Sequence, residues 1–340
     1  MKKRRKLVSL KDVAKEANVS MSTVSFALNE PNRISAGTRR HVLRIVKEQG
    51  YNRVKKGKPK GYIGIVSDYY NNMICGEFYN VVVMGILEEL KDKDSVVILD
   101  STRNDPEYFP KMITRGLVDG ALFLGPCSSD LIDIAKQKNI PIVLVGHPMP
   151  DKELHSVVPD GRSGAFQATK HLIGLGHKKI GIVTGRPAYD PIAAERLEGY
   201  LYALSQSGIA ERKDFIAEAD FCTPKSAISA AHKLLELPDP PTALFCSSDS
   251  LAYRTYIAVK EKGLSIPQDI SVVGFDDITA PDYASLPSPK LTSVHIDRMQ
   301  MGKSSVDLLI DIINNTGKPV YRHTLNVELA IKESTAPPRR

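Results

Sequence analysis

The 340-residue sequence lacks the features of secreted, disulfide-bonded and membrane-spanning proteins. Its four cysteines are far apart and form no CxxC pair, so neither a zinc ribbon nor a disulfide framework is indicated. The basic opening stretch is followed by an apolar run that is too short for a signal peptide. No apolar run approaches the length of a membrane span. These absences predict a protein of the reducing cytoplasm with no membrane partner.

The common catalytic motifs are also missing. The sequence contains no GxGxxG, GxxxxGK[ST], GxSxG or HExxH, which argues against dinucleotide, P-loop, serine-hydrolase and zinc-protease chemistry. The spacing of His171 and His177 favours surface or loop histidines over metal ligands. We therefore expect no catalytic residue, no metal and no cofactor, and we expect that the protein is not an enzyme.

Positive charge is concentrated at the N-terminus. Residues 1–60 hold 17 Lys and Arg against 4 Asp and Glu, a net charge of +13, whereas the remaining 280 residues carry a net charge of −6. Charge segregated in this way indicates that the first segment binds a polyanion. A solvated basic tail is the alternative interpretation.

Three short helical patterns lie in this basic segment. Ser9 and Asp12 form a capping box before the first pattern, Ser20 caps a second helix over residues 21–28, and Ser35 caps a third that ends at Gly50. Two helices joined by a short turn and supported by a third form a helix-turn-helix, whose second helix fits the DNA major groove. Three small helices with another interaction role remain possible, but the coincident charge favours DNA.

The segment VSLKDVAKEANVSMSTVSFALN (residues 8–29), followed in register by ISAGTRR (34–40) and EQGY (48–51), resembles the opening of the LacI/GalR family of bacterial repressors. The similarity extends through almost the whole chain. It implies roles for matched positions in the head. Base edges would be touched by Met21 and Ser22, and the phosphate backbone by Thr23, Ser25, Asn29 and Thr38.

Phe26 departs from the family pattern. Many relatives carry at this position an arginine that reads guanine with two hydrogen bonds. A phenyl ring makes no such bonds, although it can pack against a thymine methyl group. We therefore expect Phe26 to change base preference at one step of each half-site.

The linker after Tyr51 also departs from the family. Relatives run on through a hinge helix with an Ala-Arg-x-Leu stretch whose leucine wedges into the minor groove. Residues 52–61 are shorter, lack that leucine, and contain two glycines and a proline. We expect a flexible linker whose basic residues, Arg53 and Lys55 among them, hold phosphates. An interdomain linker with no DNA role is an equally open interpretation.

From residue 62 onward, short apolar runs alternate with helical patterns, which is typical of parallel sheets covered on both faces. The expected strands are residues 63–67, 96–99, 121–124, 142–145, 180–184, 243–246 and 270–275. The expected helices are residues 78–91, 130–138, 163–174, 193–207, 225–236 and 250–262. The first strand pattern occurs twice, which predicts two α/β lobes with a cleft between them, and ligands bind such sheets beyond the carboxyl ends of the strands.

The family resemblance resumes in this region with VDGA (118–121), HLIGLGH (171–177), ERLEGY (195–200) and SVVGFDD (271–277). It implies an effector site held by Arg196, Asp276, an aromatic Phe221 and Asp160, and the strand ends add His147 and Asp249. Each has a simpler interpretation: Arg196 and Asp276 could merely pair with each other, Phe221 could be core, and Asp160 could cap a helix. An arginine, a carboxylate and an aromatic together suit a sugar, with a nucleobase as the next choice.

The sequence as a whole predicts an all-α helix-turn-helix head (1–51), a basic linker (52–61) and a two-lobed, periplasmic-binding-protein-like effector domain (62–340). We expect a homodimeric transcriptional regulator, a repressor by resemblance, whose affinity for double-stranded operator DNA is controlled by a small ligand. The operator, the ligand and the sign of the response are left open. The alternative is a cytoplasmic sugar- or nucleobase-binding protein with vestigial DNA binding; a periplasmic-type binding protein and an α/β enzyme with a DNA-binding appendage fit less well.

Overall fold

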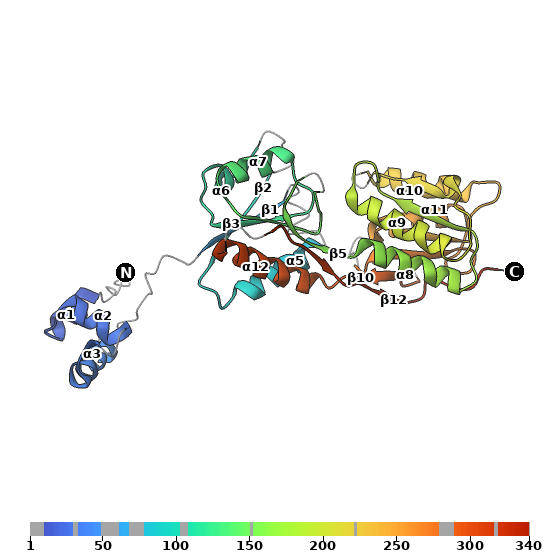
Figure 1. Ribbon diagram of the computed structural model, residues 1–340. Helices are drawn as coiled ribbons and strands as arrows, with labels where there is room; N and C mark the ends of the chain where they lie inside the picture. The colour runs from blue at the N-terminus through green and yellow to red at the C-terminus, as the bar shows by residue number, and fades with distance from the viewer. Residues whose placement is uncertain are drawn as a thin grey trace, which may run out of the picture. The chain divides into compact units, whose positions relative to one another are not determined.

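The computed structural model divides the chain into two compact units, Met1–Pro59 and Lys60–Arg340 (Figure 1). The structure describes residues 10–29, 33–48, 61–67, 78–102, 108–149, 152–220, 223–278, 289–315 and 319–339. No helix within these ranges is both long and apolar enough to cross a bilayer.

The first unit contains the three expected helices, α1 (Leu10–Glu16), α2 (Met21–Asn29) and α3 (Ala36–Glu48). Ser20 accepts a hydrogen bond from the backbone N–H of Thr23 at 3.0 Å, and Ser35 accepts one from Thr38 at 3.1 Å, so both predicted caps are present. The buried side chains come from all three helices: Val13, Ala14, Ala17, Val24, Ala27, Val42 and Ile45. A small shared core thus holds α2 against α1 and α3. The predicted capping box at Ser9 and the predicted end at Gly50 lie outside the described residues.

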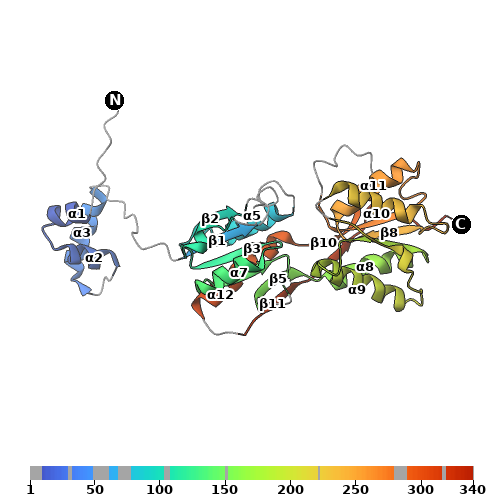
Figure 2. The ribbon, with the colours of Figure 1, turned by 90° about the horizontal axis from the view of Figure 1, so that it is seen from above.

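The second unit contains two six-stranded sheets, which define two lobes (Figures 1 and 2). The first lobe has strand order β11-β5-β4-β3-β1-β2. Its strands are β1 (Tyr62–Ser67), β2 (Val96–Ser101), β3 (Gly120–Leu124), β4 (Ile142–Val145), β5 (His155–Pro159) and β11 (Arg322–Leu325). Its helices are α5 (Tyr79–Leu90), α6 (Lys111–Thr114), α7 (Ser129–Gln137) and α12 (Arg298–Asn314).

The second lobe has strand order β12-β10-β9-β8-β6-β7. Its strands are β6 (Ile180–Thr184), β7 (Ile216–Glu218), β8 (Ala243–Cys246), β9 (Ser271–Asp276), β10 (Thr292–His295) and β12 (Glu328–Ala330). Its helices are α8 (Gly161–Gly174), α9 (Pro191–Ser205), α10 (Pro224–Leu235), α11 (Asp249–Glu261) and the short 3-10 helix Lys213–Phe215. Among the described strands of both lobes, neighbours run parallel except β10 and β12, which run antiparallel.

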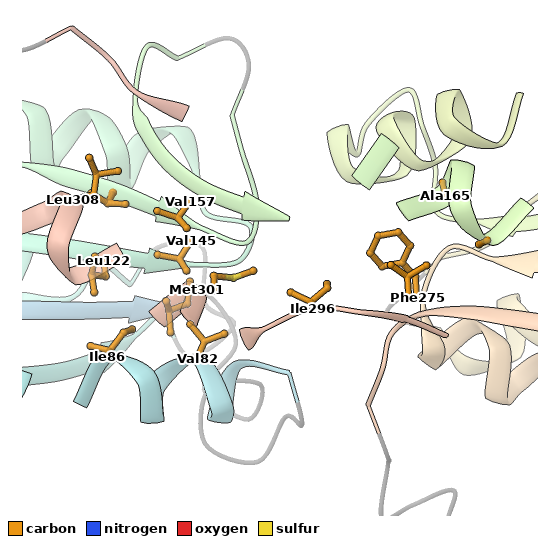
Figure 3. Close-up of a cluster of buried hydrophobic side chains, with 14 of the residues drawn as sticks. Val82, Ile86, Leu122, Val145, Val157, Ala165, Phe275, Ile296, Met301 and Leu308 are labelled. Carbon is orange, nitrogen blue, oxygen red and sulfur yellow. The ribbon is translucent and has the colours of Figure 1, made fainter. Parts of the chain in front are cut away.

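The chain passes between the lobes three times: from β5 to α8, from β10 to α12, and from β11 to β12. Ile296, on the second crossing, lies between the buried side chains of the first lobe and Phe275 of the second (Figure 3). Buried residues of both lobes belong to one continuous cluster with it. The two lobes are therefore joined by a continuous cluster of buried apolar side chains around the second crossing.

In each lobe, glycine brings two helices into backbone contact. A Cβ atom at Gly85 of α5 would lie 2.2 Å from the carbonyl oxygen of Met299 in α12, and one at Gly199 of α9 would lie 2.2 Å from that of Arg162 in α8. No side chain fits at either place, so the helices lie as close as their backbones allow. These contacts fix α5 and α9, the two helices that carry candidate ligand contacts.

Candidate DNA-binding surface and effector site

The start of α2 presents polar groups and one exposed apolar side chain. Met21 is 52% exposed, and Ser22 is exposed beside it. The hydroxyl of Ser20 hydrogen-bonds those of Ser22, at 2.7 Å, and Thr23, at 2.8 Å. Hydroxyl groups at a helix N-terminus can donate hydrogen bonds to phosphate oxygens, and they can donate to or accept from the base edges of DNA.

The remaining predicted DNA contacts divide into described and undescribed groups. The hydroxyl of Thr38 hydrogen-bonds that of Ser35 at 2.8 Å, at the start of α3. Phe26 is half-buried on α2. The side chains of Ser25 and Asn29 and the whole of Arg53 and Lys55 lie outside the described residues.

Arg196 of α9 is the central buried charge of the second lobe, with only 5% of its surface exposed. Its guanidinium donates hydrogen bonds to the carbonyl oxygen of Ser247 and, at 3.2 Å, to Oδ1 of Asp276. Its Cζ atom lies 3.7 Å from the centre of the Phe275 ring, in cation–π contact. The structure therefore brings together the predicted pair Arg196 and Asp276, as both the functional and the simpler interpretation require.

Asp276 ends β9 in an unusual backbone conformation, with φ at 109°, and Asp277 follows with φ at 50°. Burial raises the pKa of Asp276, while the positive charge of Arg196 opposes that rise. Asp277 is held by Nδ1 of His295 at 2.9 Å and by Nζ of Lys332 at 2.5 Å. The strained turn is thus anchored from two neighbouring segments, which fixes the Asp276 carboxylate in place.

Asp249 is completely buried at the start of α11, and both of its carboxylate oxygens are engaged. Oδ1 accepts a hydrogen bond from Ser293 at 2.6 Å, and Oδ2 accepts one from the backbone N–H of Ile278 at 2.7 Å. Burial, with the nearby charge of Asp276, raises its pKa well above the usual range. These bonds hold the segment after β9 in position; a direct contact from Asp249 to an effector stays a prediction.

His147 connects the two lobes. It follows β4 of the first lobe, and its Nε2 atom lies 3.3 Å from Oδ1 of Asp190, the residue that caps α9 in the second lobe. Burial tends to raise the pKa of Asp190, but hydrogen bonds from His147 and from the backbone of Ile192 bring it below its ordinary value. The predicted residue Asp160 caps α8 by accepting a 2.8 Å bond from the N–H of Ser163, as its simpler interpretation stated. A contact from Asp160 to an effector stays a prediction.

Tyr79, which our sequence analysis missed, lies beside this group. A Cβ atom at Gly146 would be 2.8 Å from its hydroxyl, so the absence of a side chain after β4 makes room for the ring. Burial raises the pKa of Tyr79, and the negative charge of Asp276 raises it further, while the positive charge of Arg196 opposes that rise. The signal was present in the sequence: an aromatic pair, Phe78 and Tyr79, opens the helix that follows the first strand. Phe221, the predicted aromatic, lies outside the described residues.

Buried polar atoms without a hydrogen-bond partner concentrate in the same region. Among the described residues they are Asn80 Oδ1, His147 Nδ1, Thr184 Oγ1, Arg196 Nε, Ser247 Oγ and His232 Nδ1. All but His232 belong to the strand ends or to the helices that carry Tyr79 and Arg196. Because a buried polar atom without a partner costs free energy, such a concentration marks a place where a ligand or ordered water supplies the missing bonds.

A surface pocket of about 630 Å³ lies elsewhere, at the C-terminal end of α9, where Tyr202 and Glu211 are among its lining residues. In the same part of α9, the hydroxyl of Tyr200 donates to the carbonyl oxygen of Ile180 at 2.7 Å, at the amino end of β6. This pocket therefore lies at the amino ends of the strands, opposite the strand carboxyl ends.

His177, which was expected in a loop or on the surface, lies in a loop but is buried. Its ring hydrogen-bonds Thr242 at 2.8 Å and Ser271 at 3.1 Å.

Two family profiles match the chain. Residues 9–53 match "Bacterial regulatory proteins, lacI family", and residues 169–335 match "Periplasmic binding protein-like domain". The chain is 33% identical over 344 residues to the HTH-type transcriptional repressor CytR of Escherichia coli (strain K12), and 98% of each protein is covered.

Solved structures agree. A complex of the transcriptional regulator CelR with cellobiose has a TM-score of 0.71 and 29% identity, with coverage of 96% of this chain and 99% of that one. The lac repressor dimer bound to operator and the anti-inducer ONPF has a TM-score of 0.74 and 25% identity, with coverage of 97% and 100%. The predicted fold class and family are confirmed. The chain belongs to the lacI family of bacterial regulatory proteins and is a DNA-binding transcriptional regulator with a helix-turn-helix head and a two-lobed effector domain.

Proposed function

We propose that the effector is a small polyhydroxylated molecule, a sugar or a sugar-bearing compound, which binds between the lobes against Arg196 and Asp276. The observation that carries this proposal is the concentration of unpartnered buried polar atoms around that ion pair. Hydroxyl groups of a sugar both donate and accept, so they satisfy Arg196 Nε, Ser247 Oγ and a carboxylate oxygen of Asp276 in one binding event. The guanidinium fork holds two neighbouring oxygens in a fixed geometry.

A second ligand class, a flat heteroaromatic ring such as a nucleobase, is favoured by Tyr79. Tyr79 is an aromatic ring beside the ends of β3 and β4, packed against Gly125 and Gly146, and a stacked aromatic pair adds about 0.5–1.5 kcal/mol to area burial. The donors and acceptors on the edge of a nucleobase would form hydrogen bonds with the unpartnered buried polar atoms, and the ion pair between Arg196 and Asp276 would stay intact.

The regulatory mechanism follows from a ligand that touches both lobes. A molecule held by residues of both lobes favours one relative position of the lobes over others. In a homodimer that places two α2 helices on an operator, this preference alters DNA affinity, and DNA alters ligand affinity by the same factor. The linker over residues 52–61 carries the signal between domains 1–51 and 62–340. The protein acts in the cytoplasm, where its DNA is, and performs no catalysis.

Thermal unfolding of the full-length protein against a panel of monosaccharides, disaccharides, nucleobases and nucleosides tests the ligand class. A sugar that raises the melting temperature of the wild type and fails to do so with Arg196→Lys supports the proposal, because lysine keeps the charge beside Asp276 but lacks the fork. Stabilisation by a free nucleobase and by no sugar favours the second class. An equal shift in wild type and Arg196→Lys contradicts a site at Arg196.

A further inference from the structure

His147 and Asp190 form a contact between the two lobes at a place where the backbone does not cross. His147 follows β4 in the first lobe and Asp190 precedes α9 in the second, and the chain continues from each within its own lobe. Nε2 of His147 lies 3.3 Å from Oδ1 of Asp190, and the two side chains are only 18% and 22% exposed. Salt screens such a partly buried pair less than it screens an exposed one.

Each partner is held firmly within its own lobe. Gly146, with φ at 79°, turns the chain at the end of β4, and its N–H donates to the carbonyl oxygen of Val157 in β5 at 2.9 Å. In the second lobe, the N–H of Asp190 donates to the carbonyl oxygen of Arg186 at 2.9 Å, and its Oδ1 accepts a bond from Ile192 at 2.9 Å. Because both backbones are anchored, a movement of one lobe against the other breaks the contact between the two side chains.

The two ring nitrogens of His147 differ in their surroundings. A carboxylate only accepts hydrogen bonds, so Nε2 carries a proton in the contact with Asp190. Although burial acts in the opposite direction, the hydrogen bond from His147 helps to hold the pKa of Asp190 below its ordinary value, which keeps that carboxylate charged. Nδ1 is buried and has no hydrogen-bond partner among the described residues. One ring therefore binds the second lobe through one nitrogen, and its other nitrogen is left to bind a molecule between the lobes.

Helix α9 connects this contact to the proposed effector site. Asp190 caps its start, and Arg196 lies on it six residues later. A second ion pair from α9, between Glu195 and Arg322 at 2.5 Å, lies at β11, where the backbone itself leads into a crossing between the lobes. His147 thus ties α9 to the first lobe at a place where no backbone connection does so.

We propose that His147 is a positioning residue whose contact with Asp190 latches the two lobes together and sets the DNA affinity of the protein before any effector binds. The latch holds α9 against the first lobe, so it favours one relative position of the lobes in the ligand-free state. An effector that bonds Nδ1 acts on the same ring. This inference rests on the proposed regulatory mechanism, in which the relative position of the lobes controls DNA affinity.

Two measurements on the full-length protein test the latch without any effector. Hydrogen exchange followed by mass spectrometry reports on the contact, and fluorescence anisotropy gives the affinity for a duplex that the wild type selects. The variants are His147→Ala, Asp190→Asn and the double variant; asparagine also caps helices well, so α9 keeps its cap. Amides of residues 146–149 should exchange faster in Asp190→Asn, and those of residues 190–193 faster in His147→Ala, because each substitution releases the partner in the other lobe.

DNA affinity should change in the same direction in both single variants, by about 5-fold or more, which is the usual size of coupling between two sites. The double variant should show no larger change, because either substitution alone already breaks the contact. His147→Gln keeps an N–H donor near the place of Nε2 and should retain most of the wild-type affinity.

His232 and Glu261 provide the control pair. Their contact is also between a histidine Nε2 and a carboxylate, at 2.7 Å, and Nδ1 of His232 is also buried without a partner, but the pair joins α10 to α11 within the second lobe. His232→Ala and Glu261→Gln should therefore leave DNA affinity unchanged.

Three results would overturn the latch: unchanged exchange in the opposite lobe, additive effects in the double variant, or equal changes of DNA affinity in the latch and control variants. Faster exchange in the opposite lobe with unchanged DNA affinity would also overturn the proposal. That result would place the failure in the proposed regulatory mechanism, because the contact between the lobes would have been demonstrated.

Discussion

Removal of an unpartnered hydroxyl in the proposed effector site should have opposite effects on stability and on ligand binding. Thr184 ends β6, is completely buried, and its Oγ1 atom has no hydrogen-bond partner among the described residues. Thr184→Val replaces this hydroxyl with a methyl group of similar size. The ligand-free protein should gain up to about 1–3 kcal/mol of unfolding free energy, because a buried group without a partner carries a penalty of that size.

Ligand binding should become weaker in the same variant. A hydrogen bond between neutral groups contributes about 0.5–1.5 kcal/mol, so the dissociation constant should rise by about 2- to 13-fold. Ser247→Ala should behave in the same way, since Oγ of Ser247 is also buried and unpartnered. Urea unfolding without ligand and calorimetric titration with the ligand found by the thermal panel give the two quantities.

Thr169→Val is the matched control. Thr169 is also completely buried, but its hydroxyl donates to the carbonyl oxygen of Ala165 at 2.8 Å within α8, so its removal should cost about 1 kcal/mol and leave ligand affinity unchanged. If Thr184→Val destabilises the protein as much as Thr169→Val does, or binds ligand as tightly as the wild type, the reasoning from unpartnered atoms is wrong.

Three further predictions concern the core, pH and salt. Gly274→Ala should destabilise the protein by about 1–3 kcal/mol in urea unfolding, because the added Cβ atom would lie 2.1 Å from Oδ1 of Asp249, which is held by a hydrogen bond from Ser293. Gly174→Ala is the control and should be neutral or stabilising, because nothing lies within 4 Å of its Cβ atom; equal effects of the two substitutions would contradict this packing. Burial lowers the pKa of His177 in the folded protein, so the unfolded state binds a proton more tightly than the folded state does. The free energy of unfolding should therefore fall as the pH drops from about 6.5 through that lowered pKa. His177→Asn should remove the contribution of His177 to this pH dependence in urea unfolding, and an unchanged pH profile would contradict the prediction. The affinity for operator DNA should fall linearly on a log–log plot against salt, and Arg40→Ala should reduce the slope by about 1 if it faces a phosphate.

Periodicity predicted the elements that are buried and regular. The three head helices and the strands β1, β2, β3, β4, β6, β8 and β9 fell within a few residues of their observed bounds, because near-continuous apolar runs and serine caps mark them. Strands β5, β7, β10, β11 and β12 were missed, since they are short and carry polar residues or proline. Helix α12 was also missed, although its packing against α5 makes it part of the first lobe.

Site residues could be predicted where the family resemblance supplied their positions. Contacts that depend on how distant segments pack together could not be predicted. Arg196 and Asp276 were named from matched motifs, and the structure brings them together at 3.2 Å. Nothing in the spacing of residues indicated that His147 meets Asp190, or that Tyr79 lies beside Gly146, because these pairs come from different lobes or loops. Whether a buried hydroxyl has a partner is likewise a property of the folded structure alone.

The most direct test of the account is fluorescence anisotropy of a labelled duplex, selected by the full-length protein, in the presence of excess random competitor DNA at modest ionic strength. We predict saturable binding to the selected duplex, and a change in its affinity when the ligand identified by thermal unfolding is added. Binding that the random competitor abolishes equally well, with and without that ligand, would contradict a regulator that reads DNA through α2 and senses a molecule between its lobes.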